Sequence, residues 1–136
     1  MTQYFFVDTS FFKAYTDVKD DFHTQALQTF QKLKGAKAQL VTSNFILDES
    51  FTVIRSKRGL EVAKQFKKIL EQFDADLKIM RVLVTDEAAA WEYFIKDWSK
   101  LSFTDCVSFA MMKRLDIRTA VSFDNHFERA GYKLIS

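Results

Sequence analysis

The amino-acid sequence predicts an α/β domain with a mostly parallel sheet and helices on both faces. Short runs of aromatic and β-branched residues alternate with stretches of helical periodicity, the pattern of parallel strands joined by crossover helices. The 136 residues include no proline and only three glycines, too few turn-forming residues for a barrel or sandwich of many short strands. The length suits one domain of roughly 100–200 residues. We therefore expect residues 1–136 to form a single domain.

Five segments are expected to be strands. The first, Tyr4–Val7, is a continuous aromatic and β-branched run, as in a strand that is buried on both faces of a sheet. The remaining candidates are residues 39–42, 78–84, 119–123 and 132–135.

Helices are expected between these strands. Asp8, Thr9 and Ser10 all favour a helix N-cap, so a helix should begin directly after the first strand. Residues 20–34 carry apolar side chains at intervals of one, three and four, the spacing of an amphipathic helix. Further helices are expected at residues 44–57, 60–73, 86–99 and 102–115, with a helical turn at 125–130.

The composition narrows the class of protein without defining its activity. A formal net charge of +2 and a pI near 8.6 allow a polyanionic partner but do not require one. The single cysteine, Cys106, cannot form an internal disulfide, and no apolar run reaches the ~20 residues of a membrane span. No signal peptide is recognisable at the N-terminus. We expect a soluble cytoplasmic protein that does not associate with membranes.

Two aspartates follow predicted strands. Asp8 comes directly after the first strand and Asp124 directly after the fourth. Ligand sites of open parallel sheets lie beyond the carboxyl ends of the strands, so both carboxylates belong to the edge where a site would form. The competing interpretation of Asp8 is a simple helix N-cap.

Two further acids lie on the inward faces of predicted helices. Glu49 has mostly apolar neighbours at offsets of three and four, whereas the adjacent Asp48 lies on a solvated face. A carboxylate on a buried face costs several kcal/mol unless a cation compensates it, and that cation is either an arginine or a metal ion. Asp105 shares the apolar side of its helix, but it also completes a capping box with Ser102, so both roles stay open.

Together the four acids indicate a metal site. Asp8, Glu49, Asp105 and Asp124 are an all-oxygen, anionic ligand set, which is typical of Mg²⁺ or Mn²⁺. Without a cation, carboxylates held so close together would raise one another's pKa values. A cysteine nucleophile at Cys106 is not expected, because the neighbouring Asp105 would raise the pKa of its thiol.

The four acids lie in motifs that resemble those of PIN-domain ribonucleases, and most closely the VapC-type toxins of toxin–antitoxin pairs. The motifs read FFVDTS at residues 5–10, TSNFILDE at 42–49, LSFTDC at 101–106 and VSFDNHF at 121–127. This resemblance implies a three-layer α/β/α fold with about five strands. It also implies metal-dependent cleavage of single-stranded RNA, an antitoxin that blocks the site, and a homodimer.

The resemblance also assigns roles to individual residues. Asp8, Glu49, Asp105 and Asp124 take the catalytic and metal-binding positions, and the hydroxyls of Thr9 and Ser122 would hold the carboxylates in orientation. Two positions depart from the family pattern. Cys106 replaces a more common alanine, and His126 stands where relatives carry either aspartate or histidine, so a fifth acid is absent. Neither departure removes one of the four acids, so an active enzyme is expected.

A group of basic residues is the candidate RNA contact. Six cations fall within fourteen residues, opposed only by Glu61, and a solvated helix surface explains them equally well. They are Arg55, Lys57, Arg58, Lys64, Lys67 and Lys68. The second choice is the group Lys113, Arg114 and Arg118.

Two other functions remain possible on the sequence alone. The chain could be an RNA-maturation nuclease without an antitoxin, or a catalytically silent PIN-fold module that only binds RNA or protein. The intact set of four acids argues against the silent module.

Overall fold

A computed structural model describes residues 2–73 and 76–136 and shows a five-stranded, fully parallel sheet. The strand order is β3-β2-β1-β4-β5. The central strand β1 (Tyr4–Val7) pairs with β2 (Gln39–Ser43) on one side and with β4 (Thr119–Val121) on the other. The outermost strands are β3 (Leu77–Met80) and β5 (Lys133–Ile135). The predicted parallel α/β fold is confirmed.

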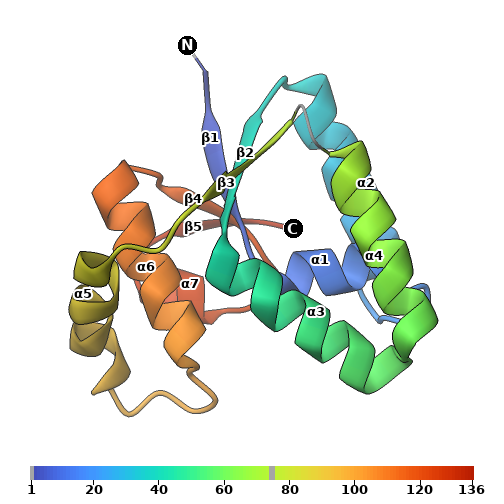
Figure 1. The fold of residues 1–136 in the computed structure, drawn as a ribbon. Helices are drawn as coiled ribbons and strands as arrows, with labels where there is room; N and C mark the ends of the chain where they lie inside the picture. The colour runs from blue at the N-terminus through green and yellow to red at the C-terminus, as the bar shows by residue number, and fades with distance from the viewer. Residues whose placement is uncertain (1, 74–75) are drawn as a thin grey trace.

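Helices cover both faces of the sheet (Figure 1). One group lies on one side and a second group on the other, while α3 starts below the carboxyl end of β2. The first group comprises α1 (Thr9–Thr16), α2 (His23–Gly35) and α4 (Leu60–Gln72), and α3 spans Asn44–Arg58. The second group comprises α5 (Val84–Phe94), α6 (Phe103–Leu115) and the short α7 (His126–Arg129).

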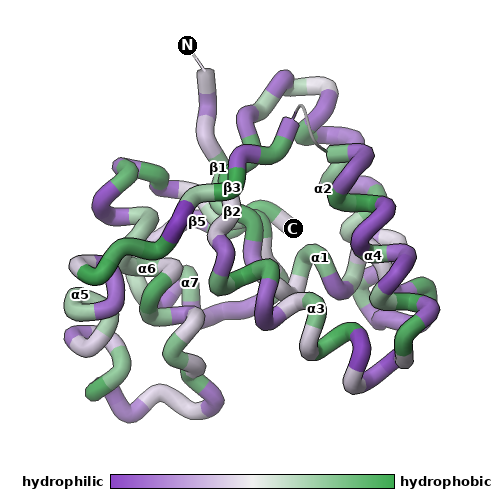
Figure 2. Tube along the Cα trace, in the orientation of Figure 1, coloured by the Kyte–Doolittle hydropathy of each residue, from purple (hydrophilic) through white to green (hydrophobic). Residues whose placement is uncertain are grey.

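Aromatic side chains fill the space between the sheet and each helical layer. On the α1–α4 side, the ring of Phe66 packs against Phe12 and Phe51, with ring centroids 5.5 and 4.8 Å apart. On the other side Phe109 meets Phe127 edge-on at 5.0 Å. Figure 2 shows hydrophobic residues concentrated on the strands, whereas α4 alternates between hydrophobic and hydrophilic positions. The two cores hold the central strands fixed, and with them the residues that follow each strand.

Two predicted strands were too long. The segment 78–84 leaves the sheet after Met80, because the Val82 amide donates to Asn44 Oδ1 (2.8 Å) and the Leu83 amide to Asp86 Oδ2 (2.9 Å). These bonds start α5 at Val84. In the segment 119–123 the strand ends at Val121. The amide of Phe123 donates instead to Ser10 Oγ (2.9 Å).

Helix boundaries also differ from the predicted ones. The helix expected at residues 86–99 covers Val84–Phe94, and the helix expected to start at residue 20 starts at His23. In the second case the Asp20 carboxylate accepts from the Phe22 amide (2.9 Å), which forms a turn ahead of the helix. None of the helices in the described ranges is long and apolar enough to cross a bilayer.

Candidate active site

The parallel strands direct three helix N-termini to one edge of the sheet. Asp8 follows β1 and is the N-cap of α1, and Ser43 ends β2 and caps α3. Ser102 caps α6, and Asp124 lies in the turn between β4 and α7. Each of the four predicted acids therefore lies at or near a strand end or a helix N-terminus on the carboxyl side of the sheet.

Asp8 is buried and held through one oxygen only. Its Oδ2 accepts from Ser10 Oγ and from Ser122 Oγ, both at 2.9 Å, and more weakly from the Ser10 amide at 3.3 Å. Its Oδ1 is buried and has no hydrogen-bond partner among the described residues. The Ser122 hydroxyl, which the sequence analysis expected to orient a carboxylate, therefore contacts the first acid.

The other three acids follow the same arrangement. Thr9 Oγ1 donates to Glu49 Oε1 (2.7 Å), the Ser102 amide to Asp105 Oδ2 (3.2 Å) and the His126 amide to Asp124 Oδ1 (2.9 Å). In the described part of the chain no hydrogen bond reaches the second oxygen of any of these carboxylates. The capping interpretation of Asp8 and Asp105 is confirmed. It leaves the site interpretation open, because one oxygen of each carboxylate caps and the other accepts no hydrogen bond from the described residues.

No lysine or arginine in the described part of the chain neutralises this acid cluster. Among residues 2–73 and 76–136, none of the ion pairs joins one of the four acids to a lysine or arginine. The arginine partner considered for Glu49 is therefore absent from the described residues.

Electrostatics show how closely the acids lie. Burial, together with the charges of Asp8, Asp124 and Glu49, raises the pKa of Asp105 to about 8. Burial likewise raises the pKa of Asp8 to about 6, against the opposing effect of its hydrogen bonds from Ser10 and Ser122. The metal-free site thus holds protons that a cation would displace.

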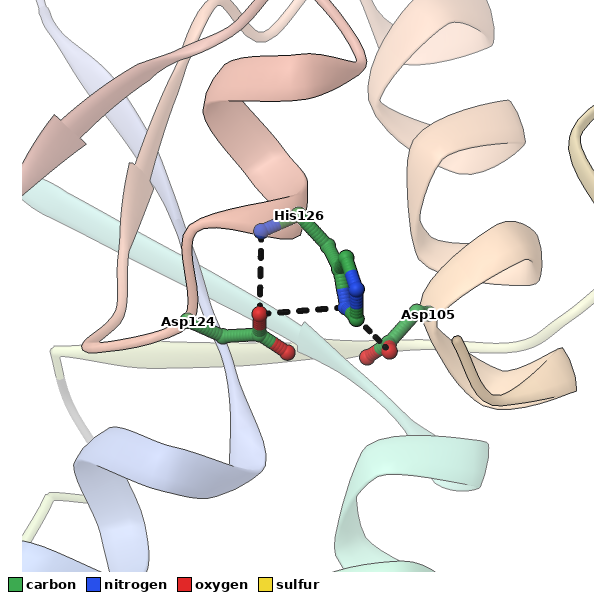
Figure 3. A group of neighbouring side chains, drawn as sticks. All are labelled: Asp105, Asp124 and His126. Carbon is green, nitrogen blue, oxygen red and sulfur yellow. Dashed lines mark hydrogen bonds and ion pairs between the residues drawn. The ribbon is translucent and has the colours of Figure 1, made fainter. Parts of the chain in front are cut away.

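His126 is a member of the site that the sequence analysis treated only as a missing acid. Its Nδ1 lies 3.1 Å from Asp124 Oδ1 and 3.5 Å from Asp105 Oδ2, between the two carboxylates (Figure 3). One ligand atom from each of these three residues falls within 4.8 Å of the other two. The signal in the sequence was the spacing Asp-x-His at the start of a helix, which puts the ring beside the carboxylate.

The residues present fit a divalent cation. The buried and unpartnered Asp8 Oδ1 and His126 Nδ1 are both electron-pair donors, and the free carboxylate oxygens add further ligands. Cys106 is not expected to act as a ligand or nucleophile, because burial together with the charge of Asp105 raises the pKa of its thiol to about 11.

Comparison with known proteins agrees with this geometry. Residues 5–133 match the sequence profile of the PIN domain. The chain belongs to the PIN-domain family. It is 33% identical over 129 residues to the 23S rRNA-specific endonuclease VapC20 of Mycobacterium tuberculosis, in strain CDC 1551 / Oshkosh and in strain H37Rv. The alignment covers 93% of this chain and 94% of VapC20.

Two solved structures share the fold of this chain. The crystal structure of M. tuberculosis VapC20, a sarcin–ricin loop cleaving toxin, superimposes with a TM-score of 0.79 at 31% identity, over 94% of this chain and 95% of the other. VapBC2 from Rickettsia felis, bound to a DNA fragment from its promoter, has a TM-score of 0.67 at 14% identity, over 98% of each chain. The second likeness concerns the fold alone.

A groove opens beside Asp124 and His126 in this PIN domain. It has a volume of about 580 Å³ and is bordered by Lys100, Arg129 and the ring of Phe123. Phe123 is stacked on Phe22 at a centroid distance of 4.7 Å. The groove thus combines two cations and one ring of this aromatic pair beside the acid cluster.

The basic residues chosen from the sequence lie elsewhere. Arg58 pairs with the buried Asp17, and Lys64 lies 3.4 Å from Glu61 on the exposed side of α4. Arg55 and Lys57 are exposed near the C-terminal end of α3, and Lys67 and Lys68 are exposed on α4. In the second-choice group, Arg114 is paired with Asp86. Lys113 and Arg118 line a hollow at the start of β4, the opposite edge of the sheet from the acids.

The raised pKa values predict how the metal-free protein responds to pH. A carboxyl whose pKa is higher in the folded state binds its proton more tightly there, so stability falls as the pH rises from the unfolded value toward the folded one. Asp105→Asn removes this cost. In EDTA we expect it to stabilise the protein by roughly 1–3 kcal/mol near pH 8, and by less near pH 5. Thermal unfolding at both pH values measures the difference.

Asp86→Asn is the matched control. Burial alone would raise the pKa of Asp86, but hydrogen bonds from Arg114 at 2.8 and 2.9 Å outweigh it and lower the pKa. The stability that a lowered carboxyl pKa contributes is fully present above the unfolded value, so this variant should be destabilised equally near pH 5 and pH 8. Equal destabilisation of Asp105→Asn at both pH values would contradict the electrostatic account of the site.

Proposed function

We propose that this PIN domain is a divalent-metal-dependent endoribonuclease and the toxin of a toxin–antitoxin pair. The observation that carries the proposal is the set of four carboxylates, each held through one oxygen and free at the other, with no lysine or arginine paired to them in the described residues. A site of this kind requires a cation and leaves room for a phosphate. The 33% identity to VapC20 makes 23S rRNA the first substrate to test.

The four acids are the proposed metal ligands and catalytic groups. Asp8, Asp105 and Asp124 bind the ion directly or through water, and Glu49 either binds it or orients the attacking water. When bound, Mg²⁺ or Mn²⁺ lowers the pKa of the attacking water and stabilises the charge that develops on the leaving 3′-oxygen.

The hydroxyl groups keep these carboxylates in place. Ser122 and Ser10 hold Asp8 Oδ2, so that the unpartnered Oδ1 keeps a fixed direction. Thr9 does the same for Glu49 through its 2.7 Å hydrogen bond. Such outer hydrogen bonds typically change metal affinity or activity by about 10–100-fold when they are removed.

The groove beside Asp124 is the proposed path of the RNA. Lys100 and Arg129 would contact backbone phosphates, and the Phe22–Phe123 pair offers a flat surface on which an unpaired base can stack. The residues Arg55, Lys57, Arg58, Lys64 and Lys68 stay a prediction, and the partner Asp17 already engages one of them, Arg58.

Protein partners follow from the same assignment. A toxin acting on cytoplasmic RNA requires an antitoxin, and a chain of the VapBC2 structure of R. felis shares this fold. An apolar surface around α5 exposes large side chains that a homodimer contact would cover: Leu83, Val84, Trp91 and Ile95 are 45%, 81%, 55% and 78% exposed.

Cleavage of RNA tests the activity directly. Asp8→Asn and Glu49→Gln should each lower cleavage of a 23S rRNA fragment at least 100-fold, since each removes a proposed ligand charge, as should EDTA until Mn²⁺ or Mg²⁺ is returned. Asp48→Asn changes the exposed neighbour of Glu49 and should leave the rate unchanged.

Four outcomes would each contradict a part of this assignment. Cleavage that persists in excess EDTA would exclude the metal mechanism, and a Glu49→Gln variant as active as Asp48→Asn would remove Glu49 from the site. Active protein that does not slow growth when it is expressed alone would favour an RNA-maturation nuclease. A folded, metal-binding protein without cleavage would favour a silent binding module.

The salt dependence of RNA binding locates the RNA path. In an Asp8→Asn background, Lys100→Ala together with Arg129→Ala should flatten the slope of log affinity against log salt by about 0.7 for each lost phosphate contact. The matched variant is Lys57→Ala, Lys64→Ala and Lys68→Ala on α3 and α4. If only this triple variant flattens the slope, the RNA lies across α3 and α4 and the groove assignment is wrong.

A further inference from the structure

We propose that His126 is itself a metal ligand through Nδ1, so that the site is a mixed nitrogen–oxygen site that prefers Mn²⁺ to Mg²⁺. This inference rests on the proposed metal-dependent function, and it adds a ligand to the four acids. It also changes the expected choice of ion.

The imidazole ring is fixed with one nitrogen already assigned. His126 Nε2 lies 2.8 Å from the backbone carbonyl oxygen of Ser99. A carbonyl only accepts hydrogen bonds, so Nε2 carries a proton, and in the neutral ring the lone pair is on Nδ1. A backbone carbonyl on the far nitrogen is the usual partner of a metal-bound histidine.

Neighbouring groups keep the ring from turning away. The ring stacks on Trp98 with planes 13° apart and centroids 6.3 Å apart, and the Arg129 guanidinium lies over the same indole at 5.6 Å. His126 is also the first residue of α7, and its amide is bonded to Asp124 Oδ1. The direction of Nδ1 is therefore set by both the backbone and the side-chain packing.

Nδ1 points at acceptors only. Among the described residues it is buried without a hydrogen-bond partner, 3.1 Å from Asp124 Oδ1 and 3.5 Å from Asp105 Oδ2 (Figure 3). A nitrogen lone pair and two carboxylate oxygens repel one another unless a positive charge lies between them. Adjacent ligands of an octahedral ion at about 2.1 Å are roughly 3 Å apart, which these separations approach. Each of these two oxygens also accepts one backbone amide, which leaves it a second lone pair for an ion.

The nitrogen ligand decides which ion is favoured. Mg²⁺ selects oxygen ligands, whereas imidazole is a ligand for first-row transition ions. Replacing the fifth carboxylate position of an all-oxygen site by a neutral imidazole therefore weakens Mg²⁺ more than Mn²⁺. The alternative is that His126 is protonated and acts as an internal counter-ion to Asp105 and Asp124.

Electron spin-echo spectroscopy of bound Mn²⁺ separates these possibilities. The chain has two histidines, and His23 bonds the Ala14 carbonyl oxygen through its own Nδ1 at 2.8 Å. We expect a nitrogen modulation from an imidazole in the wild-type protein and in His23→Asn, and its loss in His126→Asn. The affinity for Mn²⁺ measured by calorimetry should fall roughly tenfold or more in His126→Asn, and that for Mg²⁺ should fall less. His126→Asp should raise the affinity for Mg²⁺ relative to Mn²⁺.

Other results overturn the inference in distinguishable ways. Mn²⁺ that binds without nitrogen modulation, and is lost in Asp124→Asn, would leave the metal site standing and exclude His126 as a ligand. Tighter Mn²⁺ binding by His126→Asn would show that the imidazole is the counter-ion of the acids. A wild-type protein that binds no Mn²⁺ would contradict both this inference and the proposed function.

Discussion

The site depends on one constraint: carboxylates are buried at one edge of the sheet, and no lysine or arginine among the described residues pairs with them. Asp8 and Asp105 are 2% and 5% exposed, and burial raises the pKa of each. A buried charge without a partner costs several kcal/mol. The fold elsewhere pairs its buried acids, since Asp86 binds Arg114 and Asp17 binds Arg58. The unpaired acids are therefore the exception, and the proposed cation would be their missing partner.

Helix N-termini make this arrangement possible. The positive end of a helix dipole favours an anionic side chain; Asp8 is the N-cap of α1, and Asp105 lies in the first turn of α6. Each carboxylate meets a capping need with one oxygen and keeps the other for a ligand. The aromatic cores on both faces of the sheet fix these helices, because a shift of α1 or α6 would disturb rings such as Phe12 and Phe109. The geometry of the site thus depends on packing that is remote from the acids.

Much of this could be predicted from the sequence because the relevant signals are local. The run Tyr4–Val7, the caps at Asp8 and Ser102, and the order of strands and helices need only short-range patterns. The strand end at Met80 was not predictable in this way, because it depends on a bond from Val82 to Asn44, thirty-eight residues away. The RNA-binding prediction has the same weakness. Gly59 has φ of +87° between α3 and α4, and only the folded chain shows that Arg58 meets Asp17 there.

Anomalous diffraction from crystals grown with Mn²⁺ tests the central claim most directly. The account predicts an ion at the carboxyl edge of the sheet, roughly 2.1–2.3 Å from carboxylate oxygens that include Oδ1 of Asp8 and oxygens of Asp105 and Asp124. Nδ1 of His126 should be a ligand as well. Crystals in which Mn²⁺ binds elsewhere, while these acids remain without a cation, would contradict it.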